Sequence, residues 1–220
     1  GLSFKKLEML LAEEDVRPEE ISFILLTHEH SDHVAGINGF AALGTPVYTT
    51  RGTAGAVRCR NTPAWKLIPS QSVFEIAGAT IESFSIPHDA AEPVGFVVDD
   101  GAERLVWALD MGHLTAGIKT VLQSATMLVL ESNYCPKMLE ADKTRPFSLK
   151  QRIKGRHGHL SNDDTFDFLT QEKSESWKKV VLAHLSRQCN NPEALIVRYE
   201  QAGFPVEVIW PEVSESAAAI

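Results

Sequence analysis

Short apolar runs alternate along the chain with segments in which hydrophobic residues recur at helical spacing. Most of the runs are apolar at nearly every position, which is typical of strands buried on both faces. Strands are predicted at residues 21–26, 46–49, 66–68, 72–76, 79–86, 94–98, 105–109, 127–130, 180–183 and 206–209. Helices are predicted at residues 3–14, 51–58, 148–155 and 191–201, with two further helices beginning near residues 34 and 161. This interleaving of strands and helices indicates an α/β fold.

A histidine-rich stretch follows the first predicted strand. Residues 27–33 read Thr-His-Glu-His-Ser-Asp-His, so His28, His30, Asp32 and His33 supply four candidate metal ligands within six residues. They occupy a strand-to-helix turn, where open α/β sheets usually carry their sites. Alternation along an extended turn lets His28 and His30 face one point, while Asp32 and His33 can face a second. An exposed polar turn is the alternative, but the density of the cluster favours metal ligands, and its donors suit Zn²⁺, Mn²⁺ or Fe²⁺ alike.

Other candidates stand singly at the ends of predicted strands. His88 follows Pro87, and Asp89 could orient its ring. Asp110 and Glu131 each close a strand, and either carboxylate could serve in a site or in a solvated turn. The residues alone leave these alternatives open.

Composition places the chain among ordinary globular proteins. The 220 residues are 44% hydrophobic and 23% charged, which predicts a single domain over residues 1–220. No apolar run approaches the roughly 20 residues of a membrane span, and no signal peptide is visible, although the given sequence starts at Gly1 rather than Met. Cys59, Cys135 and Cys189 are odd in number and lie far apart, which favours reduced thiols and a cytoplasmic location.

The charge is unevenly distributed. The net charge of −8 argues against a general nucleic-acid surface. Residues 137–159 nevertheless contain seven Lys and Arg against two acids, a local +5 that leaves −13 for the rest of the chain. This segment could bind phosphates or form a solvated helix face. It runs into His159 and Ser161, and Ser161 with Asp164 resembles a capping box at a helix start, where backbone N–H groups favour anions.

Taken together, these motifs resemble a known family. The carriers of the resemblance are residues 27–33, Pro87-His88-Asp89-Ala90, Asp110-Met111-Gly112, Glu131-Ser132-Asn133, Gly158-His159-Leu160-Ser161-Asn162 and His184-Leu185-Ser186-Arg187. His-x-His-x-Asp-His resembles the signature of the metallo-β-lactamase fold, and the later blocks resemble its YycJ/WalJ-like branch, a relative of ribonuclease J and tRNase Z. The resemblance implies an αββα sandwich of two mixed β-sheets flanked by helices. The two strands that normally precede the first helix are missing from the given sequence, so we expect one sheet edge to be open.

The resemblance also assigns roles within the site. It implies two divalent metal ions (Zn, Mn or Fe), one on His28, His30, His88 and Asp110 and the other on Asp32, His33, His184 and Asp110. Asp110 would bridge the ions, and a shared hydroxide would attack the substrate. The implied catalytic residues are Asp32, Asp110 and His159, with His159 as proton donor or phosphate binder rather than a ligand. The implied substrate-binding residues are Arg156, His157, Ser161, Asn162 and Arg187. His113 matches no role in the family, and we expect an ordinary exposed or hydrogen-bonded histidine there.

The expected activity is phosphodiester hydrolysis. By resemblance the substrate would be a nucleic acid, DNA before RNA, cut as an exonuclease with 5′ to 3′ polarity in DNA repair. One alternative is a thioester or lactam hydrolase similar to glyoxalase II, and another is a redox member of the fold with one iron. A scaffold that uses metal only for folding is disfavoured because no ligand position is substituted. The basic segment and the block from Gly158 to Asn162 favour a phosphate substrate.

Overall fold

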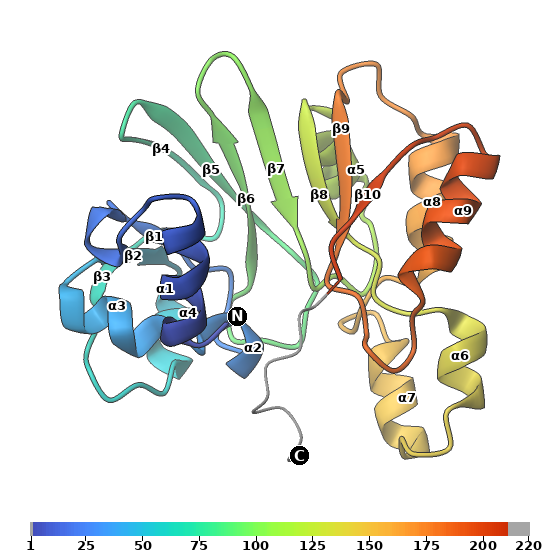
Figure 1. Cartoon of the computed structure of the whole chain (residues 1–220), viewed down its shortest axis with the longest axis horizontal. Coiled ribbons are helices and arrows are strands. Elements are labelled where there is room, and N and C mark those ends of the chain that lie inside the picture. Colours follow the sequence, from blue (N-terminus) through green and yellow to red (C-terminus); the bar gives the residue numbers. More distant parts are fainter. Residues whose placement is uncertain (1, 211–220) are drawn as a thin grey trace. The chain divides into compact units, whose positions relative to one another are not determined.

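The computed structural model describes residues 2–210, which divide into two compact units (Figure 1). The first unit contains the residues up to Ser72 together with Ala90–Val94, and the second contains Val73–Asp89 and the chain from Gly95 onward. Each unit has its own sheet and its own core. The prediction of one domain over residues 1–220 stays a prediction.

The first unit is built on a small parallel sheet. Its strands are β1 (Ile24–Leu25), β2 (Pro46–Thr49) and β3 (Ala64–Leu67), in that spatial order. Parallel neighbours need crossover connections, and helices supply them. The helical elements of this unit are α1 (Phe4–Glu13), η1 (Pro18–Glu20), α2 (Ser31–Val34), α3 (Ile37–Leu43) and α4 (Arg51–Ala56). Leu26, Ile37, Val47 and Val57 form the core between sheet and helices.

Two local features of this unit differ from the predictions. The first strand is only two residues long, although Leu26 N–H still donates to Tyr48 O at 3.0 Å. The helix expected from residue 34 is divided, because the histidine-rich turn itself begins α2 at Ser31 and α3 starts separately at Ile37. Among the described residues no strand precedes α1.

The second unit is built on a seven-stranded mixed sheet. Its strand order is β10-β9-β8-β7-β6-β5-β4. The strands are β4 (Ser72–Ile76), β5 (Ala79–Ser85), β6 (Val94–Asp99), β7 (Arg104–Ala108), β8 (Met127–Glu131), β9 (Lys179–Ala183) and β10 (Glu207–Val208). The β6–β7 pair is antiparallel, whereas β7, β8, β9 and β10 pair in parallel. The hairpin predicted at Gly78 is present, and positive φ at Ala77 (51°) and Gly78 (82°) supplies its turn.

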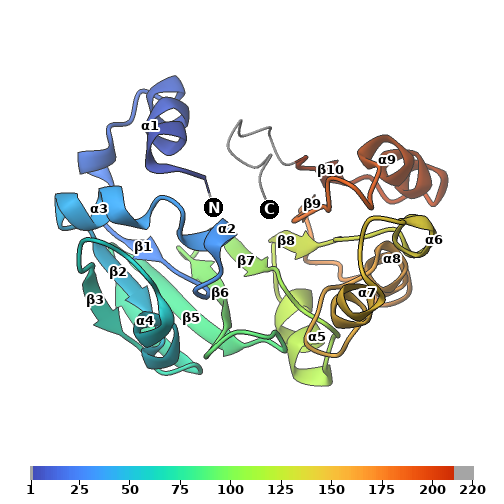
Figure 2. The same ribbon diagram turned by 90° about the horizontal axis from the view of Figure 1, so that it is seen from below.

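Helices cover one face of the parallel part of this sheet, as Figure 2 shows for α5 and α8. The helices of the unit are α5 (Ala116–Gln123), α6 (Pro136–Ala141), α7 (Phe147–Ile153), α8 (Asn162–Gln171) and α9 (Pro192–Gln201). The main core joins strand residues such as Leu128, Leu130 and Leu182 to Leu122 of α5 and Leu169 of α8. Helices α5 and α6 were not predicted. None of the helices in residues 2–210 combines the length and the apolar character needed to cross a membrane.

Candidate metal centre

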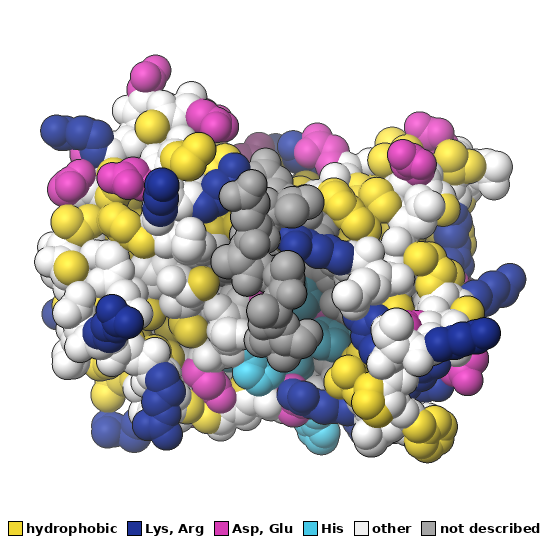
Figure 3. All heavy atoms as spheres, turned by 60° about the horizontal axis from the view of Figure 1, so that its bottom comes forward, with side chains coloured by type: hydrophobic (Ala, Val, Ile, Leu, Met, Phe, Trp, Pro, Cys, Tyr) yellow, Lys and Arg dark blue, Asp and Glu magenta, His cyan; other side chains and the backbone are white. Residues whose placement is uncertain are grey.

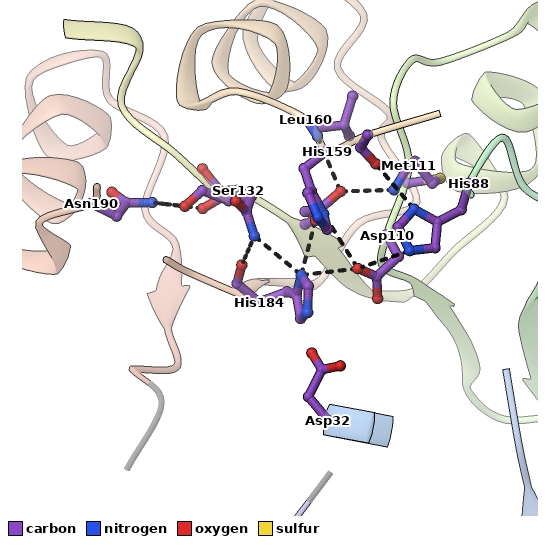
Figure 4. A network of polar contacts seen from close by, with 12 residues as sticks. Asp32, His88, Asp110, Met111, Ser132, His159, Leu160, His184 and Asn190 are labelled. Carbon is purple, nitrogen blue, oxygen red and sulfur yellow. Dashed lines mark hydrogen bonds and ion pairs between the residues drawn. The ribbon is translucent and has the colours of Figure 1, made fainter. Parts of the chain in front are cut away.

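The carboxyl ends of three parallel strands of the second unit carry ionisable side chains. Glu131 is the last residue of β8, His184 directly follows β9, and Asp110 lies two residues beyond β7. The register pairs Glu131 with Ala183 and Ala108 with Leu130, so the three strand ends meet at one edge of the sheet. This is the edge at which parallel sheets place their sites, and Figure 4 shows the side chains of Asp110 and His184 there.

Two of these residues have a left-handed backbone. Asp110 and His184 both have φ of 58°, a region that residues other than glycine adopt at a cost of about 1–3 kcal/mol when the surroundings enforce it. Hydrogen bonds hold the turn after Asp110. Met111 N–H donates to Glu131 Oε2 at 2.8 Å, and Gly112 N–H donates to Pro87 O at 3.0 Å. Such enforced conformations cluster at functional sites.

Glu131 is the hub of the group. Its side chain is fully buried, its Oε1 lies 2.7 Å from His159 Nδ1 and 2.9 Å from His184 Nδ1, and its Oε2 accepts from the N–H groups of Met111 and Leu160. Burial by itself would raise the pKa of Glu131, but His159 opposes this and holds the pKa below its usual value. The carboxylate is therefore an ionised, fully bonded centre, and the solvated-turn alternative for Glu131 is wrong.

Asp110 joins the same cluster. Its Oδ1 lies 3.3 Å from Nδ1 of both His159 and His184 and 3.8 Å from His88 Nε2 (Figure 4). Asp110, Glu131, His159 and His184 each offer one ligand atom, and these atoms all lie within 4.8 Å of one another. Burial alone would lower the pKa of His159, but the Glu131 and Asp110 carboxylates raise it to about 10. A set of two half-buried imidazoles and two buried carboxylates fits a divalent cation such as Zn²⁺, Mn²⁺ or Fe²⁺.

His88 is oriented by a backbone carbonyl. Its Nδ1 lies 3.2 Å from Gly158 O, so Nδ1–H donates there and Nε2 is left for a ligand on the side of Asp110. Histidines that bind metals usually donate their other ring N–H in this way. The prediction that Asp89 orients this ring is wrong. Asp89 Oδ1 is 3.6 Å from His88 Nε2, too far for a hydrogen bond, and Asp89 Oδ2 instead pairs with Arg152 Nε.

The histidine-rich turn of the first unit gathers its own imidazoles. The ring centroid of His28 lies 4.7 Å from that of His30 and 4.1 Å from that of His33. Thr27 Oγ1 lies 3.1 Å from His28 Nδ1 and 3.5 Å from His33 Nδ1, so one hydroxyl helps to orient two rings. Asp32 is exposed, and its Oδ2 is 3.6 Å from His33 Nε2. This donor set also fits a divalent metal, and the combination of both sets on two shared ions stays a prediction.

Two residues predicted to bind substrate are buried and hydrogen-bonded inside the second unit. Ser161 is buried and caps α8, with its Oγ accepting from Asp164 N–H at 3.1 Å. The predicted capping box is thereby confirmed. Asn162 is also buried, and its Oδ1 accepts from Ser132 Oγ at 2.9 Å and from Asn190 Nδ2 at 3.0 Å. Ser161 and Asn162 therefore have structural partners, and their predicted contact with substrate stays a prediction.

Asn190 was missed by the sequence analysis, yet it ties the loops of the site together. Its Nδ2 donates to Ser132 O and Asn133 O, both at 2.8 Å, and its Oδ1 accepts from Asn162 Nδ2 at 2.9 Å. These atoms belong to the loop after β8, the loop after β9 and the start of α8, which lead to or from Glu131, His184 and His159. No sequence signal beyond an Asn-Asn-Pro helix start marked this residue.

Truncating Asn190 should destabilise the chain without touching a candidate ligand. Asn190→Ala removes the Asn190 partners of Ser132 O, Asn162 Nδ2 and Asn191 N–H, and burying such groups without a partner costs about 1–3 kcal/mol of unfolding free energy. Urea unfolding followed by circular dichroism measures this loss. Gln201→Ala, at an exposed position in α9, is the matched control and should change stability by less than about 0.5 kcal/mol.

The remaining predicted residues lie at the surface. Arg156, His157 and Arg187 are exposed, and the backbone O of His157 accepts from Asp89 N–H at 3.0 Å. His113 is partly exposed, with Nδ1 2.9 Å from Arg156 O, so the expectation of an ordinary hydrogen-bonded histidine is confirmed. The predicted contacts of Arg156, His157 and Arg187 with a substrate stay predictions.

Residues 5–185 match the family model described as a beta-lactamase superfamily domain, and the chain belongs to this family. Its fold is that of the metallo-β-lactamases, with sheets flanked by helices as predicted, and the chain is a metallo-hydrolase. It is 34% identical over 198 residues to exodeoxyribonuclease YycJ of Bacillus anthracis, a match that covers 88% of this chain and 75% of the relative. It is 34% identical over 203 residues to exodeoxyribonuclease WalJ of Streptococcus pneumoniae, covering 88% and 74%. The resemblance to the YycJ/WalJ-like branch is thereby confirmed.

Solved structures share the fold at low sequence identity. The metallo-β-lactamase fold protein YhfI from Bacillus subtilis superposes with a TM-score of 0.68 at 14% identity, covering 94% of this chain and 80% of that one. The short form of human tRNase Z superposes with a TM-score of 0.58 at 15% identity, covering 93% and 81%. At these identities the likeness concerns the fold alone.

Proposed function

We propose that this chain is a metal-dependent nuclease that removes nucleotides from the end of a DNA strand, with 5′ to 3′ polarity and a role in DNA repair. The observation that carries the proposal is the pair of buried Glu131 and half-buried His159, which lies beside Asp110 at the edge of the sheet. Hydrolysis of a phosphodiester needs a proton for the leaving oxygen, and this pair holds one. The names of the two relatives, both exodeoxyribonucleases, support the same substrate class.

The proposal includes two divalent ions, with zinc, manganese and iron as candidates. His28, His30, His88 and Asp110 would hold one ion, and Asp32, His33, His184 and Asp110 would hold the other. Bound cations of this kind make water acidic enough to act as a nucleophile and neutralise charge on the phosphate. The low exposure of His88 and Asp110 is consistent with ligand roles for both.

His159 is proposed as the proton donor. Its Nδ1–H donates to Glu131 Oε1 at 2.7 Å, which fixes the ring and leaves Nε2 as the nitrogen that faces other partners. The two neighbouring carboxylates favour the protonated ring. The ring therefore enters the reaction charged, passes its Nε2 proton to the leaving 3′- or 5′-oxygen, and remains hydrogen-bonded to Glu131 as the neutral form. Glu131 is a positioning residue in this scheme.

The role of His159 can be tested with two leaving groups. His159→Ala should lower kcat on a DNA strand by about 10²- to 10⁴-fold, the usual contribution of a positioned acid. The loss should be much smaller on bis(p-nitrophenyl) phosphate, because p-nitrophenolate departs without a proton. Equal losses on both substrates would contradict the proton-donor role and favour a role for His159 in binding phosphate or metal. Metal analysis of the purified variant separates those two.

The function itself is tested on end-labelled strands. Single- and double-stranded DNA and RNA are incubated with the chain and Zn²⁺, Mn²⁺ or Fe²⁺, and a thioester and a lactam serve as controls. The expected result is stepwise release of mononucleotides from DNA with 5′ to 3′ polarity. Turnover of the thioester or lactam without strand degradation would overturn the nuclease proposal. Oxygen consumption with one iron per chain would instead identify a redox enzyme.

A further inference from the structure

The basic segment forms a helical arm in the second unit. We define the basic arm as residues 136–156, which contain α6, α7 and the links beside them. The arm follows the loop after β8 and ends three residues before His159. Figure 3 views the molecule from the side on which these helices lie, and Lys and Arg side chains (dark blue) gather over them. The sequence left open whether this charge binds phosphate or is merely solvated.

The arm is fixed to the loops that carry candidate ligands. Arg145 pairs with Asp142 and also contacts Cys189, with Nη1 3.2 Å from Sγ, in the loop that follows His184. Arg152 at the other end of the arm pairs with Asp89, the neighbour of His88.

The end of the arm also packs against the turn after Asp110. A Cβ on Gly112 would lie 2.3 Å from the backbone C and O of Arg156, so the two segments touch without a side chain between them. A strand bound to the arm would therefore be held in a fixed position relative to His88, Asp110 and His184. A mobile solvated helix would need none of these anchors.

The arm carries exposed positive charges and one exposed aromatic ring. Phe147, at the start of α7, is 74% exposed, the highest value among the large hydrophobic side chains in residues 2–210. Lys137, Lys143 and Lys154 are exposed on the same arm. Some of the charge is neutralised locally, because Lys154 pairs with Glu140 at 3.2 Å and Arg145 with Asp142. An exposed ring fills no core. A basic segment that also exposes a ring suits a single strand, whose bases can stack on the ring while its phosphates pair with lysines.

We propose that the basic arm binds single-stranded nucleic acid and leads it to the metal centre, with Phe147 stacking on an unpaired base. The proposal rests on the proposed nuclease function and adds that the chain binds its substrate as a single strand. An unpaired strand is favoured over a duplex because a duplex keeps its base faces stacked and unavailable to a protruding ring. Charge complementarity supports the choice of a polyanion, since the arm carries a net +5 from Lys137 to His159 in a chain of net −8.

Fluorescence anisotropy with a 5′-fluorescein oligothymidylate tests the proposal. Binding is measured in EDTA, where no strand is cut, and again with the Mn²⁺-loaded chain and a phosphorothioate strand that resists cleavage. Phe147→Ala should weaken binding about 5- to 150-fold, the range for loss of one base stack. Lys137→Gln with Lys143→Gln should lower the slope of log Kd against log salt by about 0.7 for each phosphate that is no longer neutralised. The same measurement with single-stranded RNA and with a blunt DNA duplex shows which form of nucleic acid the chain prefers.

Val73→Ala is the matched control for the aromatic variant. Val73 is 67% exposed on β4, an edge strand of the same sheet, and its removal should leave binding unchanged. Unchanged single-strand binding by Phe147→Ala, with melting temperature retained, would overturn the role of the arm, as would tighter binding of the duplex than of the single strand. Because binding is scored without cleavage, a chain that binds through Phe147 but cuts no strand would overturn the nuclease function alone.

Discussion

Asp110→Ala is expected to abolish metal-dependent hydrolysis, with a fall in kcat/KM of about 10³-fold or more. The side chain is almost fully buried and its Oδ1 faces His88, His159 and His184. A bound metal supplies several kcal/mol of transition-state stabilisation, and each 1.4 kcal/mol corresponds to about tenfold in rate. Removing the carboxylate that lies among these imidazoles should therefore remove both the metal and the chemistry.

Metal binding by this variant can be read without an activity assay. At 100 times its Kd, a bound ion adds about 2.7 kcal/mol to the unfolding free energy. For a chain of this size that should raise the melting temperature by roughly 5–10 °C. The parent chain should show this shift with Zn²⁺ or Mn²⁺, whereas Asp110→Ala should lose most of it. Asp167→Asn, at an exposed carboxylate of α8, is the control and should keep the full shift. Nuclease activity retained in Asp110→Ala would refute the two-metal proposal.

Gly158→Ala is expected to have the second largest effect, although glycine has no side chain to take part in chemistry. A Cβ at this position would lie 2.2 Å from Ile153 O and 2.3 Å from Arg152 O, both backbone atoms that cannot rotate away. The loop must move, and with it the carbonyl that holds His88 Nδ1 and the adjoining His159. We expect a loss of about 1–3 kcal/mol in unfolding free energy from overpacking and a fall of about 10²-fold in hydrolysis from the misplaced rings.

Gly117→Ala provides the comparison for this variant. Gly117 lies in α5, where a Cβ would meet nothing within 4 Å. Alanine there should stabilise the helix by up to about 1 kcal/mol and leave hydrolysis unchanged. Urea unfolding and a strand-degradation assay on both variants make the comparison. If Gly158→Ala were as stable and as active as the parent, the close packing of this loop would not matter to the site.

Much of the secondary structure could be predicted because its causes are local. The apolar runs of β2 and β4 and the Ser161–Asp164 capping box depend on neighbours within a few residues, and all three were predicted with the correct bounds. Helices α5 and α6 were not predicted, and each packs a buried leucine, Leu122 of α5 and Leu139 of α6, against residues distant in sequence. The divided helix after the histidine-rich turn likewise has no local sequence cause that we can name.

At the site, what the sequence determines differs clearly from what the tertiary structure decides. The sequence by itself determined which side chains can bind a metal, because imidazole and carboxylate groups at strand ends are chemically suited to it wherever the chain goes. Only the tertiary structure decided which partner holds each one. The sequence offered Asp89, one residue away, as the partner of His88, but the ring donates to Gly158 O, 70 residues away. The sequence did not decide whether Glu131 belongs to a site or to a solvated turn, but the carboxylate lies fully buried between His159 and His184. A hydrogen bond depends on which atoms the packed strands and loops bring opposite each other, and that arrangement comes from the core of the whole unit rather than from residues adjacent in sequence.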